Sequence, residues 1–206
     1  DISKWDVSGV SAMTCVFAGA ASFNGDISKW DVSKVIYMGR MFDGATSFNS
    51  DISKWGVSKV TDMRSMFKGA TSFNSDISAW DVSRVTTMQA MFQSANSFNG
   101  DLSAWNVRRV TTMLAMFKVN SIFNGDISSW NTSSVETMNS MFNHAGAFNG
   151  DLSAWDVRRV TNMYAMFYDV TTFDQKNLCS NGTSWDTTGK VVTYMFSLCC
   201  TCEGCA

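Results

Sequence analysis

Aspartate recurs every 25 residues in this sequence, and a column of carboxylates is its clearest arrangement that could do chemistry. Seven aspartates share one position of a repeated unit: Asp1, Asp26, Asp51, Asp76, Asp101, Asp126 and Asp151. Stacked on one another, they would offer the hard oxygen ligands that calcium prefers. The alternative is an Asx turn, in which each carboxylate bonds to nearby backbone. Because the unit lacks the Gly-Gly and Asp pattern of calcium-binding repeats, the sequence favours the turn and predicts no cofactor.

Methionine sulfur is a second set of possible ligands. Two columns of methionine recur with the same period: Met13, Met38, Met63, Met88, Met113, Met138 and Met163, and Met41, Met66, Met91, Met116, Met141 and Met166. Thioethers bind Cu(I), so a copper ladder is conceivable. Val10, Met13 and Phe17, however, have the spacing of one apolar helical face, and methionine commonly fills gaps in cores. A tryptophan column running from Trp5 to Trp155 could stack on sugars or bases, but its regularity also favours a structural role. Both residue types are predicted to lie in the core.

Cysteines gather at the C-terminal end of the chain, where they could form disulfides or bind zinc. Five of the six lie there: Cys179, Cys199, Cys200, Cys202 and Cys205. Zinc would rest on one C-x-x-C pair, from Cys202 to Cys205, with no well-spaced second pair. Two glycosylation sequons, at Asn131 and Asn181, favour an oxidising, secretory setting. The sequence therefore favours a disulfide-linked cap over zinc.

Cys15 stands apart from the other cysteines. It lies in the first unit, at the opposite end of a stiff stack, whereas disulfide partners need α-carbons within about 7 Å. We expect Cys15 to be free or joined to another chain.

Catalysis, nucleic-acid binding and membrane spanning are not predicted. His144 is the only histidine, and no Ser-His-Asp, phosphate-loop or HExxH pattern accompanies it. The formal net charge of -2 does not attract nucleic acid. No run of about 18 apolar residues is long enough to cross a membrane.

The element that must position these residues is a 25-residue unit, repeated seven times over residues 1–175 without insertion. Trp5 and Val7 alternate as in a strand, Ser8 could cap a helix, and Val10–Phe17 has helical spacing. We therefore expect an α/β repeat solenoid, right-handed and leucine-rich-repeat-like, with one short parallel strand and one short helix per coil. Residues 176–206 are expected to form a degenerate eighth repeat and a cysteine-rich cap. Because no polar cap precedes the first unit, we expect a processed product or a fragment.

Position 4 of the unit changes character along the chain. It is lysine in Lys4, Lys29 and Lys54, and then it becomes small. The small residues are Ala79, Ala104, Ser129 and Ala154. This smooth stretch, represented by Ala79, Ala104 and Ala154, is predicted to contact a protein partner.

Two segments of the unit resemble a known family. The sequences F-N-G-D-I-S-K-W-D-V-S at Phe23–Ser33 and V-T-x-M-x-x-M-F at Val60–Phe67 resemble the repeats of mycoplasma lipoproteins and BspA-like surface proteins, which are leucine-rich-repeat relatives. The resemblance implies a secreted or surface-displayed solenoid with no catalytic residue. We expect a scaffolding subunit of an extracellular or cell-surface assembly, acting through protein contacts that include self-assembly. The alternatives are an adhesin for a host protein or glycan and, third, an accessory subunit of an intracellular complex.

Overall fold

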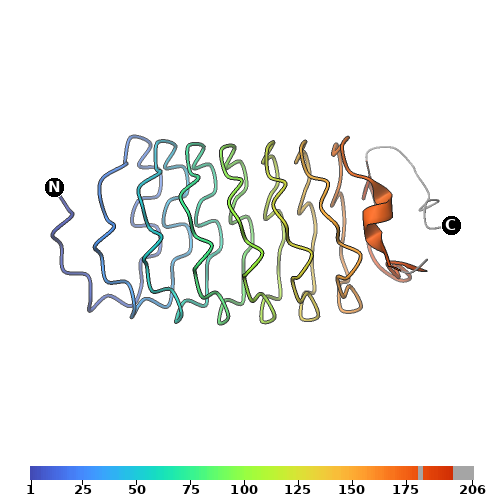
Figure 1. The fold of residues 1–206 in the computed structure, drawn as a ribbon, viewed down its shortest axis with the longest axis horizontal. Coiled ribbons are helices and arrows are strands. Elements are labelled where there is room, and N and C mark those ends of the chain that lie inside the picture. Colours follow the sequence, from blue (N-terminus) through green and yellow to red (C-terminus); the bar gives the residue numbers. More distant parts are fainter. Residues whose placement is uncertain (181–182, 197–206) are drawn as a thin grey trace.

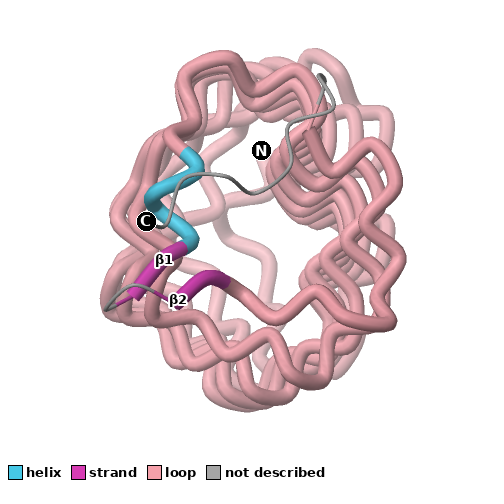
Figure 2. The backbone as a smooth tube through the Cα atoms, turned by 90° about the vertical axis from the view of Figure 1, so that its right-hand side faces the viewer, coloured by secondary structure: helices cyan, strands magenta, loops and turns pink. Residues whose placement is uncertain are grey.

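The protein is a stack of coils, one for each 25-residue unit (Figure 1). The computed structural model describes residues 1–180 and 183–196. Viewed along the stack, successive coils superimpose (Figure 2). Isolated parallel bridges join residues at position 12 of neighbouring coils, beginning with Ala12 and Tyr37 and ending with Asn162 and Val191. One turn of the stack therefore equals one sequence period.

Regular secondary structure is confined to the C-terminal end of the described residues. A short 3-10 helix, η1, spans Gln175–Leu178. It leads into strands β1, Cys179–Ser180, and β2, Thr183–Ser184, which pair antiparallel. No α-helix occurs at residues 1–180 or 183–196, and turns fill the coils. The expected α/β, leucine-rich-repeat-like coil of one parallel strand and one helix is therefore wrong.

The helix is absent because two positions of each coil have left-handed backbone. Position 15 has positive φ in every coil, for example 61° at Cys15 and 52° at Ser65. Position 19 does too, with 72° at Gly19 and 58° at Val119. A right-handed helix needs negative φ at each residue. The segment from Met13 to Phe17 therefore cannot continue as a helix.

Alternate amides in this segment bond to different coils. The N–H groups of Met13, Cys15, Phe17 and Gly19 donate to carbonyls of the second coil at 2.7–3.1 Å. The amides of Val16 and Ala18 donate three residues back, as Ala18 does to Cys15 at 3.1 Å. Three-residue turns thus space the apolar side chains much as a helix would.

The predicted strand at Trp5 and Val7 is also replaced by turns. The Trp5 amide donates to the Ile2 carbonyl at 3.1 Å, and the Val10 amide donates to the Val7 carbonyl at 2.9 Å. Both bonds fold the chain back on itself within one coil, so this segment does not pair with its neighbours as a strand.

The core is a set of side-chain ladders, as predicted for methionine and tryptophan. From the second coil onward the methionine columns are fully buried, as at Met38 and Met41. The rings of Phe42 and Phe48 stack with centroids 3.8 Å apart within a coil, and Phe42 lies 5.7 Å from Phe67 in the next. The phenylalanine rings of the inner coils therefore pack against rings above and below, which favours stacking.

Residues 185–196 add a further coil to the stack. Trp185 is buried, its ring stacks on Trp155 at 6.3 Å, and its Nε1 donates to the Leu152 carbonyl at 3.1 Å. Phe196 stacks on Phe167 at 5.5 Å. Trp185 and Phe196 thus make the same kinds of ring contact that join the earlier coils.

Candidate functional site

The aspartate column forms Asx turns. The Oδ1 atom of Asp26 accepts the Ser28 backbone N–H at 2.9 Å and the Ser28 hydroxyl at 2.7 Å. These two bonds hold the pKa of the Asp26 carboxyl below its ordinary value, because they stabilise the charged form. Asp1 and Asp51 make the same backbone bond. At residues 1–180 and 183–196, no three His, Cys, Asp or Glu side chains gather where they could hold a metal ion.

An asparagine ladder, which we did not predict, joins the coils at position 24. The Asn49 backbone N–H donates to Asn24 Oδ1 at 2.8 Å, and Asn74 donates to Asn49 in the same way. The ladder continues to Asp174, whose amide donates to Asn149 Oδ1. The period of asparagine in the sequence was visible, but the direction of its bond was not.

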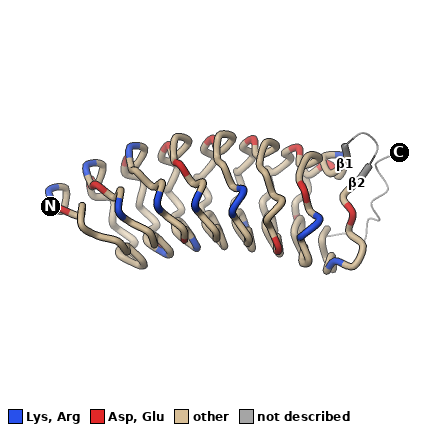
Figure 3. Tube along the Cα trace, turned by 90° about the horizontal axis from the view of Figure 1, so that it is seen from below, with Lys and Arg blue, Asp and Glu red and all other residues tan. Residues whose placement is uncertain are grey.

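The predicted partner face lies on the outside of the stack. Ala79, Ala104 and Ala154 are exposed, as are Lys4 and Lys29 earlier in the same row. Figure 3 shows charged residues arranged in rows along the coils. The side chain at position 4 thus changes from lysine to alanine along an exposed surface. That this surface binds a protein partner stays a prediction.

The remaining predicted site residues are spread over the molecule. Cys15 is an exposed free thiol in the first coil. Asn131 is exposed, and its Oδ1 accepts the Ser133 backbone N–H at 3.1 Å. Cys179 begins β1. The other members of the predicted cap and the second sequon lie outside the described residues: Asn181, Cys199, Cys200, Cys202 and Cys205. The disulfide cap therefore stays a prediction.

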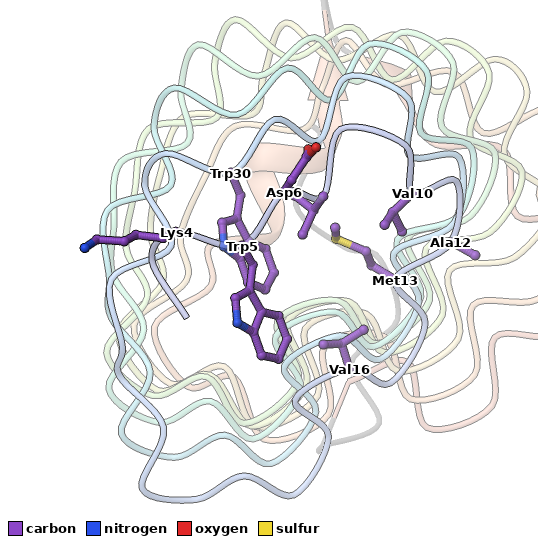
Figure 4. A pocket seen from close by; sticks show the side chains of 9 residues that line it. Lys4, Trp5, Asp6, Val10, Ala12, Met13, Val16 and Trp30 are labelled. Carbon is purple, nitrogen blue, oxygen red and sulfur yellow. The ribbon is translucent and has the colours of Figure 1, made fainter. Parts of the chain in front are cut away.

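The first coil exposes surfaces that every later coil buries. Trp5 is 60% exposed, whereas Trp55 is 4% exposed. The Trp5 ring stacks on Trp30 with centroids 6.4 Å apart. Both rings line a hollow of about 580 Å³, together with Met13 and Val16 (Figure 4). Lys4 points away from this hollow (Figure 4). We call this surface the N-terminal edge.

Backbone groups at the N-terminal edge match those that join coils elsewhere. Carbonyls at positions 12, 14, 16 and 18 accept amides of the preceding coil throughout the stack, but in the first coil no described residue donates to them. They belong to Ala12, Thr14, Val16 and Ala18. Trp5 Nε1 likewise has no acceptor among residues 1–180 and 183–196, whereas Trp30 Nε1 donates to the Ile2 carbonyl at 3.1 Å.

The last described coil carries donors complementary to the N-terminal edge. In the last described coil, the backbone N–H groups of Val192, Tyr194 and Phe196 donate to no described residue. Position 15 is represented there by Tyr194, whose φ of 54° matches that position in the other coils. We call residues 192–196 the C-terminal edge.

A second hollow lies at the corner of the last coils and was missed in the sequence. It measures about 500 Å³, and its lining residues are Lys118, Ser140, Asn143, His144, Tyr164, Ala165, Tyr168 and Tyr194. Three of the chain's four tyrosines meet there. The readable signal was tyrosine at positions 14 and 18 of the seventh unit, where no other unit has an aromatic residue. We call this the tyrosine hollow.

Comparison with known families adds one finding. A family model described as a Mycoplasma protein of unknown function, DUF285, matches residues 1–105 and residues 88–203. The chain belongs to the DUF285 family. Because each match is several units long, the DUF285 model itself spans several coils. No curated protein matches the chain.

DUF285 membership confirms the mycoplasma part of the expected resemblance. The family match does not test the expected resemblance to BspA-like proteins. The predicted leucine-rich-repeat strand and helix are absent from the described coils. Within the described part of this DUF285 chain, no helix is long and apolar enough to cross a membrane.

Proposed function

We propose that the protein is a non-enzymatic scaffolding subunit that assembles through protein-protein contacts, end to end. The observation that supports this is the N-terminal edge: among the described residues its tryptophan ring is exposed and its four backbone carbonyls accept no hydrogen bond, although the same groups join coils elsewhere in the stack. Unpaired edges of this kind are templates for pairing with another chain.

The partner that fits the edge is the C-terminal edge of a second copy. In the stack, amides at positions 13, 15 and 17 donate to carbonyls at positions 12, 14 and 16 of the next coil. The amides of Val192, Tyr194 and Phe196 occupy the donor positions, and Ala12, Thr14 and Val16 of another copy supply the acceptors. Such a head-to-tail contact does not close on itself, so it produces a linear assembly.

The assembly would lie outside the cell or at its surface. Support comes from the resemblance to mycoplasma surface proteins and from Asn131, the exposed acceptor residue of a sequon. A kinship with BspA-like surface proteins is part of the same proposal and rests on the F-N-G-D-I-S-K-W-D-V-S segment at Phe23–Ser33.

Sedimentation velocity of the full chain over a range of concentrations tests this function. We expect the mean sedimentation coefficient of the wild type to rise with concentration. Trp5→Asp places a carboxylate on the exposed ring position and should keep the chain monomeric. Ala79→Asp, on the outer row of small residues, is the matched control and should associate like the wild type.

Two results would contradict the proposal. A wild type that stays monomeric at every concentration rules out self-assembly. Association that is lost in Ala79→Asp and retained in Trp5→Asp would move the contact from the N-terminal edge to the outer row.

A further inference from the structure

The three tyrosines of the tyrosine hollow lie outside the buried core of the stack. Tyr164, Tyr168 and Tyr194 are 40%, 37% and 62% exposed, whereas the aromatic rings that stack between inner coils are almost fully buried. No residue of the described ranges forms a hydrogen bond with any of the three hydroxyl groups. The three rings therefore form an exposed aromatic cluster outside the buried core, and exposed clusters of this kind often mark binding sites.

The rings in the hollow stand at angles to one another. Tyr164 and Tyr194 meet edge to face, with centroids 5.9 Å apart and planes at 89°. Tyr168 and the His144 ring lie 5.7 Å apart at 43°. The ring surfaces thus form walls of a hollow of about 500 Å³, within the range of small-ligand sites in proteins.

A buried amide supports the polar side of the hollow. Asn143 is 7% exposed, and its Nδ2 donates to the Ala165 carbonyl at 3.3 Å. Its Oδ1 lies 2.7 Å from Nδ1 of His144, and Nε2 of His144 lies 3.5 Å from Asp169 Oδ2. His144 is therefore held on two sides, and its orientation in the hollow is set before any ligand arrives.

The chemistry of this lining favours one ligand class. We propose that the tyrosine hollow binds a pyranose unit of a glycan. A sugar ring has apolar C–H faces that pack on aromatic rings and hydroxyl groups around its edge. The three tyrosine hydroxyls and the Lys118 ammonium, which has no ion-pair partner within the described part of the chain, can bond to those hydroxyls.

Other ligand classes fit this lining less well. A nucleic acid would need a basic surface, but Asp169 lies beside His144 and the whole chain is slightly acidic. A protein anchor residue would need an apolar pocket, and here tyrosine hydroxyls, an amide, a hydroxyl and an ammonium group share the lining with the rings.

Saturation-transfer difference NMR on the full chain tests the proposal. The probes are methyl glycosides of glucose, galactose, mannose, N-acetylglucosamine and sialic acid, each added alone. We expect saturation transfer from the protein to the ring protons of at least one glycoside. Comparing the neutral sugars with the acidic sialic acid shows how much the Lys118 ammonium contributes to binding. Tyr164→Ala and Tyr168→Ala should each weaken binding by about tenfold, the effect of losing one aromatic contact.

The fourth tyrosine supplies the matched control. Tyr37 is 49% exposed and lies in the second coil, so Tyr37→Ala should leave binding unchanged. Tyr168→Phe retains the ring and should keep most of the affinity, which separates a lost contact from a misfolded chain. The inference fails if no glycoside receives saturation, or if Tyr164→Ala and Tyr168→Ala bind as well as Tyr37→Ala. Because Tyr194 also belongs to the C-terminal edge, all variants are compared in the Trp5→Asp background, which is expected to stay monomeric.

Discussion

The tryptophan indole shows what one residue contributes to joining two coils. Trp80 is 3% exposed, and its Nε1 donates to the Ile52 carbonyl in the preceding coil at 3.1 Å. Trp80→Phe removes that bond and part of the buried ring, so we expect the free energy of unfolding to fall by about 1–3 kcal/mol. Urea denaturation measures it. Trp5→Phe is the control, because Trp5 is 60% exposed and has no described acceptor. An equal loss in both variants would contradict this role of the indole bond.

The turn carboxylates make stability depend on pH. Hydrogen bonds from Arg158 lower the pKa of the Asp156 carboxyl to about 2 from an ordinary 3.8, and bonds from serine or threonine lower the pKa of nine other aspartates. These are Asp6, Asp26, Asp31, Asp51, Asp76, Asp81, Asp101, Asp126 and Asp186. A carboxyl whose folded pKa is lowered stabilises the fold above its unfolded pKa, and that contribution is lost as the pH falls through the folded value.

We therefore expect the melting temperature to stay level above about pH 4 and to fall between about pH 4 and pH 2. Asp156→Asn should flatten the lowest part of this curve, because it removes the carboxyl with the pKa of about 2. Thermal melts followed by tryptophan fluorescence provide the measurement. A melting temperature that does not change on acidification would show that these turns are equally stable when protonated.

Single residues were the most predictable part of the molecule. Met38, Met41 and Trp55 are buried as the sequence suggested, because an identical residue in every unit must meet identical surroundings in a stack. Trp5 was the exception in its column. The exposure of Trp5 depends on whether another coil precedes the first one, and the sequence of the unit does not reveal that.

At the scale of the coil, left-handed residues decide the shape. Position 19 is glycine in the first three coils, with φ of 67° at Gly69, but it is Val119 in the fifth, with φ of 58°. A β-branched residue is strained there, so Val119→Gly should raise the free energy of unfolding by about 1 kcal/mol. Gly69→Val should lower it by about the same amount. A Cβ at Gly69 would meet its nearest atom at 3.6 Å, so the expected cost is conformational rather than a clash.

Chemical denaturation of both variants beside Gly56→Ala checks this argument. Gly56 does not have positive φ, and an added Cβ there would meet only ordinary contacts, the nearest at 3.7 Å. We expect Gly56→Ala to change stability little. Should Val119→Gly destabilise the fold as much as Gly69→Val does, backbone strain at position 19 would not be the controlling factor.

The helix prediction failed at this same scale. Successive three-residue turns place Val10, Met13 and Phe17 inward, so the apolar spacing could not distinguish them from a helix. Gly19, Gly44 and Gly69 were a readable sign of left-handed backbone. Position 15 carried no such sign, because Arg40 and Ser65 adopt positive φ there without glycine. Bonds to the next coil hold those residues in place, and this tertiary cause cannot be seen in local sequence.

For the whole molecule, the stack implies tolerance to removal of one complete coil. Each coil contacts mainly its two neighbours, so stability should be close to a sum over coils and interfaces. Deleting residues 76–100 joins two equivalent positions, and we expect a folded, less stable chain. Deleting residues 76–87 breaks the register and should unfold the stack around it. Near-ultraviolet circular dichroism and hydrogen exchange distinguish the two. Equal disruption by both deletions would contradict independent coils.

Surfaces that depend on the whole molecule were only partly predictable. The alignment of Ala79, Ala104 and Ala154 in one outer row could be predicted from the 25-residue period alone. The tyrosine hollow required knowing that positions 14, 15 and 18 of neighbouring coils share a corner, which a helix would have arranged differently. The sequence shows Tyr164 and Tyr168 as departures from the unit, but only the fold brings Tyr194 beside them.

The alternate orientation of the amides gives any end-to-end assembly a direction. Two N-terminal edges cannot join through residues 12–18, because carbonyl would face carbonyl there, so the two tips of a growing filament are chemically different. A Trp5→Asp chain would still offer Val192, Tyr194 and Phe196 to the tip that accepts them, but would present a blocked edge afterwards. Added in small amounts, it would act as a chain terminator and shorten filaments from one tip only.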